Sequence, residues 1–485
     1  MPEMNTRWQR TTIVLGAVFA AAAFLCSLPY CWDYVYSWPS VLAYVAAACS
    51  VVFTLTIRPR GAGMYCLVLF LIALALRAAW ALHASFPPTG DDYEYYRSVS
   101  LELLRGQWNE LFQTFWPWGY FLYLAGLARL FGPSLMVPVA VNSIAGAATS
   151  LLVYVIARRF FEERAARIAG GIYALWPGVV YWSGVLCTEI PHLVLFLGAL
   201  LCLLRGLQAK SAGAAWALAG GLMAALSEFF RPLTPLLLIP YLLYSCGQGD
   251  GSSPGGRLRR RGRWKDAGLA LAAYAVCLGI LLTGESVASG RPNMTTSHTM
   301  GINLAFGLNW ESRGMFNVAD AQFMLAEDPL EVNRRGFQLA RERLRTMGGR
   351  NWWRLPVLAA WKFPVNWSLE AAGLDATYAG VPESRKESHW LTTFQDELSA
   401  VAQYFHAGVL ALAAVGFWRN RRAWGLALPA GILIAFALLH AVFEVDCRYH
   451  FCAQSLLAVA GAGAFARCAK ARIAGRDVHA VGPRQ

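Results

Sequence analysis

Two adjacent carboxylates, Asp91 and Asp92, follow a long apolar stretch in the segment PTGDDYEYYRSVSLELLRG. Carboxylates beside an apolar segment are costly unless water, a cation or a reaction stabilises them. A carboxylate within hydrogen-bond reach of a hydroxyl group can accept its proton as a general base. Capping of a helix needs only one aspartate. The second carboxylate at Asp91 and Asp92 is therefore more than a helix cap requires, and water, a cation or a reaction could be what stabilises the pair.

Four cationic side chains occupy positions where a charge is expensive or close to the membrane interface. Arg77 lies well inside the apolar run Gly63–Ser85, and a charge in such a run is usually functional. Arg231, Lys362 and Arg448 lie near the expected ends of apolar segments. For these three the alternative is structural, because long cationic side chains also snorkel to the interface or pair with nearby carboxylates.

A second group of ionisable residues precedes the last apolar run. It contains the acids Glu444 and Asp446 and the basic residues Arg448 and His450. The two basic residues could bind an anion, or they could pair only with the two acids. The sequence leaves both interpretations open.

A divalent cation is compatible with the carboxylates but is not required by their spacing. Asp91, Asp92, Glu189 and His298 could supply hard ligands. The eleven cysteines lie mostly inside apolar runs and form no CxxC pair, which indicates small buried side chains and not a metal site or a disulfide framework. No cofactor is therefore predicted, and a divalent cation remains an open possibility.

The composition shows what kind of molecule must position these side chains. Hydrophobic residues make up 57% of the 485 residues, charged residues only 15%, and the mean hydropathy is +0.41. Such a chain cannot hide its apolar surface in one soluble core, which predicts an all-α multi-pass membrane protein. The net charge of +13 fits arginines that anchor cytoplasmic loops better than it fits nucleic-acid binding.

Apolar runs of spanning or nearly spanning length predict about twelve transmembrane helices, the shorter ones relying on flanking residues. The first run is expected to be a helix and not a signal peptide, because it lacks a clear cleavage site. The predicted runs are Thr11–Tyr30, Val41–Ile57, Gly63–Ser85, Leu135–Ala157, Ile168–Tyr181, Ile190–Leu204, Ala212–Ser227, Leu233–Ser245, Ala267–Thr283, Leu398–Trp418, Ala423–Phe443 and Phe451–Ala466.

Arginine-rich connections alternate along the chain and predict that both termini are cytoplasmic. The Gly-, Ser- and Arg-rich stretch Gly247–Lys265 is then a cytoplasmic linker. The segments Trp116–Phe131 and Trp353–Leu369 must stay on the outer side as interfacial pieces. The outer face thus collects the acidic pair, Glu189, Arg231, the segment Glu285–Arg354 and the residues Glu444–His450.

Two short helices are predicted on this outer face. One begins at Asp92 and ends at Gly106, with apolar residues at helical spacing between them. The other begins after Asp328, which is followed by proline at the first helical position, and ends at Gly348–Gly349. Its apolar stripe consists of Leu330, Phe337, Ala340, Leu344 and Met347. This amphipathic helix predicts a small external cap.

Several segments, in their order and spacing, resemble polyprenyl-phosphate-dependent glycosyltransferases of the GT-C class, above all the bacterial protein-mannosyltransferase-like enzymes and the aminoarabinose transferase of lipid A. Asp92, Tyr96 and Gly106 match an acidic residue four positions before a tyrosine that begins a short helix. VLCTEI places Glu189 at the family's second acidic position, and SEFFRPLTPLLLIP resembles an Arg-Pro that begins a later helix. FWPWGYFLYLAGLARLFG, GINLAFGLNWESRGMFN, AAWKF and DCRYHFCAQSLLAV are similar to further family segments.

The resemblance implies a GT-C-like helical bundle with outer juxtamembrane helices and a small cap. It implies four regions. Residues 1–62 form a two-helix extension, 63–284 the membrane core with a first outer loop over 86–133, 285–397 the cap with interfacial helices, and 398–485 a three-helix segment with a basic cytoplasmic tail.

The resemblance also implies a reaction. A sugar moves, with inversion, from a polyprenyl-phosphate donor to a lipid, glycan or protein acceptor at the outer face of a bacterial cytoplasmic membrane. Asp92, or Asp91, is the implied base, and Glu189 orients the acceptor or a cation. Cationic groups neutralise the charge that grows on the leaving phosphate. The residues implied to bind the donor are Arg77, Tyr96, Arg231, Lys362, Arg448, Tyr449 and His450.

Two other functions remain open. A polysaccharide polymerase or ligase would also use a lipid-linked glycan. A transporter could have about twelve helices as well, but its ionisable groups would lie near the middle of the membrane.

Overall fold

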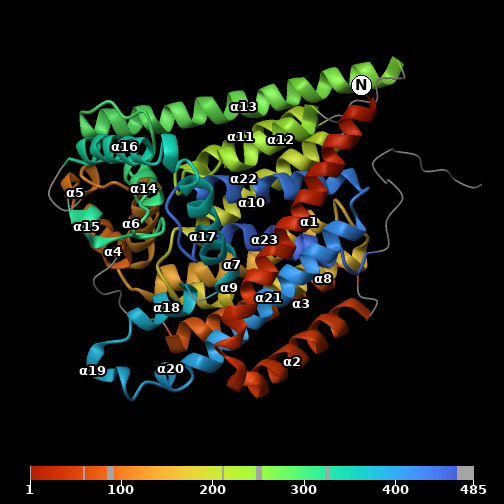
Figure 1. Cartoon of the computed structure of the whole chain (residues 1–485), viewed down its shortest axis with the longest axis horizontal. Coiled ribbons are helices and arrows are strands. Elements are labelled where there is room, and N and C mark those ends of the chain that lie inside the picture. Colours follow the sequence, from red (N-terminus) through yellow and green to blue (C-terminus); the bar gives the residue numbers. More distant parts are fainter. Residues whose placement is uncertain are drawn as a thin grey trace, which may run out of the picture.

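The computed structural model describes residues 2–57, 61–84, 92–209, 212–246, 254–322, 328–370 and 372–466. Every regular element in these ranges is a helix (Figure 1). The all-α, multi-pass class predicted from the sequence is confirmed. Asp91, residues 247–253 of the predicted linker and the basic tail after residue 466 lie outside the described residues. The rest of the predicted linker, residues 254–265, is helical, because the helix Pro254–Ser289 begins before the apolar run.

In the described ranges, seven helices are long and apolar enough to cross a membrane. They are α1 (Pro2–Trp32), α2 (Trp38–Ile57), α3 (Ala62–Ala84), α7 (Met136–Ala157), α10 (Glu189–Gln208), α13 (Pro254–Ser289) and α21 (Gln395–Arg419). Four further predicted runs form the shorter helices α11 (Gly213–Glu228), α12 (Pro235–Cys246), α22 (Ala427–Val442) and α23 (Phe451–Ala462). The structure therefore leaves the predicted number of twelve spans unconfirmed.

One predicted run is divided. Ile168–Tyr181 forms α8 (Glu163–Ala174) and, after a break, α9 (Pro177–Tyr181). Pro177 has no backbone N–H and its ring clashes with the preceding turn, so it starts a new helix and does not continue the old one. Apolar periodicity alone does not reveal such a break.

Small residues let the long helices approach closely. A Cβ added to Gly416 of α21 would stand 1.9 Å from the carbonyl oxygen of Ala460 in α23. One added to Gly221 of α11 would stand 2.2 Å from that of Ala270 in α13. Membrane helices commonly pack through such small residues. All residues of α23 are buried, so this helix forms part of the centre of the bundle.

Shorter helices gather at one end of the bundle, on the left in Figure 1. They are α4 (Asp92–Leu104), α5 (Asn109–Phe112), α6 (Trp118–Phe131), α14 (Met300–Gly307), α15 (Val318–Ala321) and α16 (Pro329–Thr346). As predicted, α4 begins at Asp92, and Gly106 beyond its end has a φ of +77°. This left-handed conformation favours glycine and stops the helix.

The amphipathic helix α16 is also confirmed. The Asp328 side chain accepts a hydrogen bond from the backbone N–H of Leu330 at 2.9 Å. The helix buries Ala340 and Met347, and its Gly336 lies against Gly301 of α14. The remaining three residues of the predicted stripe recur every seven positions and stay partly exposed, at 39% for Leu330, 40% for Phe337 and 43% for Leu344. This second apolar line is free to face the membrane interface.

The segment after α16 forms a helix that packs against helices of the bundle. The predicted interfacial piece Trp353–Leu369 forms α17 (Arg354–Ser368), which packs against α1 and α22. Its Trp367 is buried, with its ring edge-on to Phe19 of α1 at 4.6 Å. Three short helices follow: α18 (Ala372–Ala379), α19 (Glu383–Lys386) and α20 (Trp390–Thr393).

Candidate active site

An ion pair joins the start of α4 to the turn between α22 and α23. Nη1 of Arg448 lies 3.5 Å from Oδ2 of Asp92, and its Nε lies 3.7 Å from Oδ2 of Asp446. Asp446 also accepts the backbone N–H of Arg448 at 3.0 Å, which fixes the turn. Both long contacts leave the guanidinium N–H groups poorly satisfied, and Nε has no hydrogen-bond partner in the described part of the chain.

A second ion pair lies at the start of α10. Glu189 is the first residue of this helix, where the helix dipole favours a negative charge, and its carboxylate pairs with Arg231 just after α11. Arg231 also donates to the hydroxyl of Thr188 at 3.1 Å. Burial alone would lower the pKa of Arg231, but the Glu189 carboxylate raises it. The glutamate is nearly buried, whereas the arginine keeps some exposure.

Tyr96 of α4 lies between the two pairs. Burial raises the pKa of its hydroxyl well above the usual value. The carboxylates of Asp92 and Glu189 raise this pKa further, and the guanidinium groups of Arg448 and Arg231 lower it. All four charges therefore act on the same tyrosine. The structure brings together these five residues that the sequence singled out.

Aromatic rings hold Tyr96 in place. It meets Tyr120 edge-on at 5.1 Å and Phe121 at 5.4 Å, both from α6, and Trp116 at 5.9 Å. Helix α6 thus supports the inner face of α4, whose first residue is Asp92. The predicted outer segment Trp116–Phe131 positions the site in this way.

Tyr449 and Glu444 extend the charged group. The Tyr449 hydroxyl donates to Oε2 of Glu444 at 3.2 Å, and its ring stacks on His440 with centroids 5.0 Å apart. The Arg448 guanidinium lies 5.4 Å from the centre of the Tyr449 ring. Burial raises the pKa of Glu444 to about 7. The predicted pairing of Arg448 with Asp446 is observed, but Glu444 binds the tyrosine and not the arginine.

Lys362 does not join this group. Its ammonium donates to the backbone carbonyls of Gly307 at 2.9 Å and Phe443 at 3.0 Å, and the residue is 1% exposed. Burial lowers its pKa to about 7. Lys362 joins the end of α14 to the end of α22, directly before Glu444. These two contacts make it a support for the site, and its predicted role in donor binding stays a prediction.

Arg77 lies elsewhere in the bundle. Its Nη1 donates at 3.2 Å to the carbonyl of Ala174, the last residue of α8, and at 3.1 Å to that of Ala73. Its stem fills the space left by Gly146 of α7, since a Cβ there would stand 2.6 Å from Nε. The side chain is fully buried. Nη1 thus caps the end of α8, while Nε and Nη2 have no hydrogen-bond partner in the described ranges, and the donor-binding role implied by the resemblance stays a prediction.

His450 points away from the charged group. It is 2% exposed on its side chain, and its Nε2 lies 2.8 Å from Oε2 of Glu370. His406 of α21 faces the same oxygen from 3.1 Å. Sequence reasoning missed Glu370 and His406. His406 lies inside the predicted run Leu398–Trp418, so an ionisable residue in an apolar stretch was the available signal.

The predicted cation ligands Asp92, Glu189 and His298 do not converge. In the ranges that the structure describes, the three-residue group that could hold a metal consists of Glu370, His406 and His450. The backbone of His298 instead donates to the carbonyl of Phe115 at 2.8 Å. A cation bound by the outer carboxylates therefore gains no support from this geometry.

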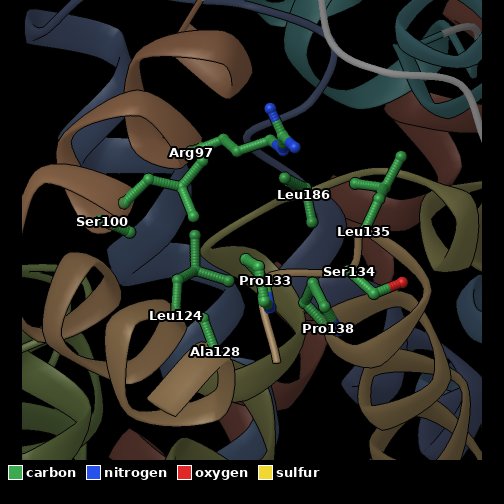
Figure 2. A pocket seen from close by; sticks show the side chains of 10 residues that line it. Arg97, Ser100, Leu124, Ala128, Pro133, Ser134, Leu135, Pro138 and Leu186 are labelled. Carbon is green, nitrogen blue, oxygen red and sulfur yellow. The ribbon is translucent and has the colours of Figure 1, made fainter. Parts of the chain in front are cut away.

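A small cavity lies beside the charged group, between α4, α6 and the start of α7 (Figure 2). Figure 2 shows Arg97 and Ser100 on α4, opposite Leu135 and Leu186. Its volume of about 30 Å³ admits water but no sugar. Asp92 and Arg448 keep 33% and 28% of their side-chain surface exposed, so a substrate group can reach both side chains from that side.

Comparison with known proteins agrees with the motifs. Residues 117–280 match the sequence model of the dolichyl-phosphate-mannose-protein mannosyltransferase family. This segment contains Glu189 and Arg231 but ends before Arg448. The match bears out the resemblance to GT-C glycosyltransferases. No curated protein matches the chain.

Solved structures give distant matches. The archaeal oligosaccharyltransferase AglB from Archaeoglobus fulgidus, in complex with an inhibitory peptide and a dolichol-phosphate, has a TM-score of 0.46 and 14% identity over 82% of this chain. The chain spans 50% of that structure's length. ArnT from Cupriavidus metallidurans, bound to undecaprenyl phosphate, has a TM-score of 0.40 and 16% identity, covering 83% of this chain and 78% of its own.

Proposed function

We propose that this protein is an integral membrane glycosyltransferase that moves a sugar from a polyprenyl-phosphate donor to an acceptor hydroxyl, with inversion at the anomeric carbon. One observation carries the proposal: a partly exposed carboxylate, Asp92, lies 3.5 Å from the guanidinium of Arg448. A base and a phosphate-binding cation thus stand side by side. The family match over residues 117–280 supports the same class of reaction.

Asp92 accepts the proton of the acceptor hydroxyl while the new glycosidic bond forms. The bond between the anomeric carbon and the phosphate oxygen breaks at the same time, so negative charge grows on the phosphate. Arg448 is suited to that charge, because its nearest carboxylate oxygens lie 3.5 and 3.7 Å away and leave N–H groups for phosphate oxygens. Arg231, held by Glu189, adds a second positive charge.

We place the reaction at the outer face of a bacterial cytoplasmic membrane, where arginine placement in the sequence puts Asp92. The acceptor is a lipid, a glycan or a protein. The proposal requires no metal at the outer carboxylates.

The test is a transfer assay with purified protein and a panel of polyprenyl-phosphate sugars in detergent or liposomes. We expect lipid-phosphate release with at least one donor, loss of turnover in Asp92→Asn, and an inverted anomeric centre by NMR of the product. Activity only with a diphosphate-linked glycan would favour the polymerase or ligase. No release with any donor, from folded protein, would contradict the proposal.

A further inference from the structure

A buried group of ionisable side chains lies beneath the proposed site. Oε2 of Glu370, in the link between α17 and α18, faces Nε2 of His450 at 2.8 Å and Nδ1 of His406 at 3.1 Å. These three ligand atoms all lie within 4.8 Å of one another, and all three residues are buried. The mechanism above uses none of them.

The hydrogen bonds around His406 create a conflict. Its Nε2 lies 3.0 Å from the backbone carbonyl of Trp367, which can only accept, so Nε2 carries the proton. A neutral His406 then turns the lone pair of Nδ1 towards the carboxylate oxygen of Glu370. Two acceptors facing each other at 3.1 Å repel unless a positive charge lies between them. The His406 side chain is 0% exposed, so bulk water does not reach this contact.

Neighbouring polar groups hold Glu370 and His406 in place. Gln454 donates to Oε2 of Glu370 at 2.6 Å, and Gln403 accepts the backbone N–H of Glu370 at 2.9 Å. Gln403 lies one turn before His406 on α21 and donates in turn to the carbonyl of Ser368. Metal-binding histidines almost always donate their second N–H to a carbonyl or carboxylate, as His406 does to Trp367.

We propose that Glu370, His406 and His450 form a buried site for a divalent transition metal of the Zn²⁺ type. A proton on Nδ1 of His406 would relieve only its own contact with Glu370, whereas the three ligand atoms, all within 4.8 Å of one another, are close enough for one ion to bind all of them. Two imidazoles and one carboxylate are a ligand set that Zn²⁺ accepts, with ligand distances of about 2.0–2.2 Å. Such distances separate ligand atoms in a tetrahedral site by about 3.3 Å, so the contacts of 2.8 and 3.1 Å between Glu370 and the two histidines would lengthen only slightly.

The metal would join three segments that are far apart in sequence. Glu370 follows α17, His406 belongs to α21, and His450 immediately precedes α23. His450 lies two residues after Arg448, so the ion would fix the turn that presents Arg448 and Tyr449. This role is structural and does not depend on the proposed sugar transfer.

The test is the metal content of the full chain, purified with a tag that contains no histidine. We expect about one Zn²⁺, or another transition metal, per chain by inductively coupled plasma mass spectrometry. Protein stripped with a chelator should melt at a lower temperature and recover on addition of Zn²⁺. Loading with Co²⁺ should produce the visible absorption of a low-coordinate site.

Substitutions of the proposed ligands test whether the metal binds at this site. His406→Gln and Glu370→Gln should lose the metal and the Co²⁺ absorption, whereas His83→Gln, which changes an exposed histidine on α3, should keep both. If these variants do not fold, His450→Cys keeps a ligand and should add a sulfur-to-cobalt band. A wild-type chain that binds no metal before or after reloading would overturn the site, as would metal content that is unchanged in the folded variants.

Discussion

Nη1 of Arg448 lies 3.5 Å from Oδ2 of Asp92, although the two residues are more than 300 positions apart in the sequence. Asp92 opens α4, and Arg448 follows α22. The contact is too long for a strong hydrogen bond. It keeps the carboxylate and the guanidinium in one place while leaving each able to bind a substrate group.

Asp92→Asn should lower turnover by about a hundredfold or more, because the amide cannot accept the proton. The donor should still bind, since Arg448 and Arg231 are unchanged. The melting temperature should stay close to wild type, because asparagine keeps a capping oxygen and the lost ion pair is partly exposed. Sugar transfer, donor binding and a thermal melt measure these three effects. Glu94→Gln, an exposed carboxylate on the same helix, is the control. A wild-type rate in Asp92→Asn would make the aspartate a helix cap only.

Arg448→Ala should weaken binding of the polyprenyl-phosphate donor. A charge-assisted hydrogen bond contributes about 1.5–3 kcal/mol, which is roughly a 10- to 100-fold change in affinity. Titration with the lipid phosphate alone, without its sugar, isolates this contact. Arg105→Ala, at an exposed position after α4, should bind normally. Unchanged affinity in Arg448→Ala would show that the arginine only pairs with Asp92 and Asp446.

Glu444 should make stability depend on pH. Burial raises its pKa in the folded protein to about 7, above the value of about 4.3 for an unperturbed carboxyl. The folded state therefore binds the proton more tightly, and the stability linked to Glu444 is present below pH 4 and is lost as the pH rises towards 7. The full loss is about 4 kcal/mol at most. Glu444→Gln should lose less stability than wild type between pH 5 and 7.5 in thermal melts. Parallel curves for the two proteins would show that Glu444 is not the group responsible.

Local sequence signals correctly predicted where two helices at this end of the bundle begin or end. Asp92 and Gly106 mark the start and stop of α4, and Asp328 marks the start of α16, because capping and left-handed glycine act within a few residues. Glu189 and Arg231 were both predicted site residues. Their pairing was not predicted, since it depends on how α10 packs against α11.

Long-range packing explains the differences. The position of Arg77 inside an apolar run suggested a functional role. In the folded bundle its guanidinium donates to the backbone carbonyl of Ala174, at the end of α8. Lys362 was expected at an interface, yet it finds the carbonyls of Gly307 and Phe443, which are remote in sequence. The pairing of Glu370 with His406 likewise depends on where α18 and α21 lie. One sequence without its packing carries no information on these contacts.

The orientation in the membrane can be tested with single cysteines in a cysteine-free background. Glu311 and Glu383 are exposed at the end of the bundle that carries α4, and Arg164 is exposed at the start of α8. An impermeant maleimide should label Glu311→Cys and Glu383→Cys in intact cells, because positively charged loops stay in the cytoplasm. Arg164→Cys should react only after permeabilisation. The reverse pattern would place Asp92 inside the cell.

The ion pair between Glu189 and Arg231 should couple strongly in a double-mutant cycle. The Glu189 side chain is only 5% exposed, so Arg231→Ala leaves a buried charge without its partner. Loss of one member of a buried pair costs about 3–5 kcal/mol. Arg231→Met combined with Glu189→Gln removes both charges, keeps similar volumes and should be more stable than Arg231→Met alone. Thermal melts of wild type, both single variants and the double variant give the coupling energy.

Arg448→Met and Asp92→Asn form a matched cycle at the more exposed pair, where the coupling should be about 1 kcal/mol or less. Additive effects at Glu189 and Arg231 would mean that this pair does not hold α10 to the end of α11.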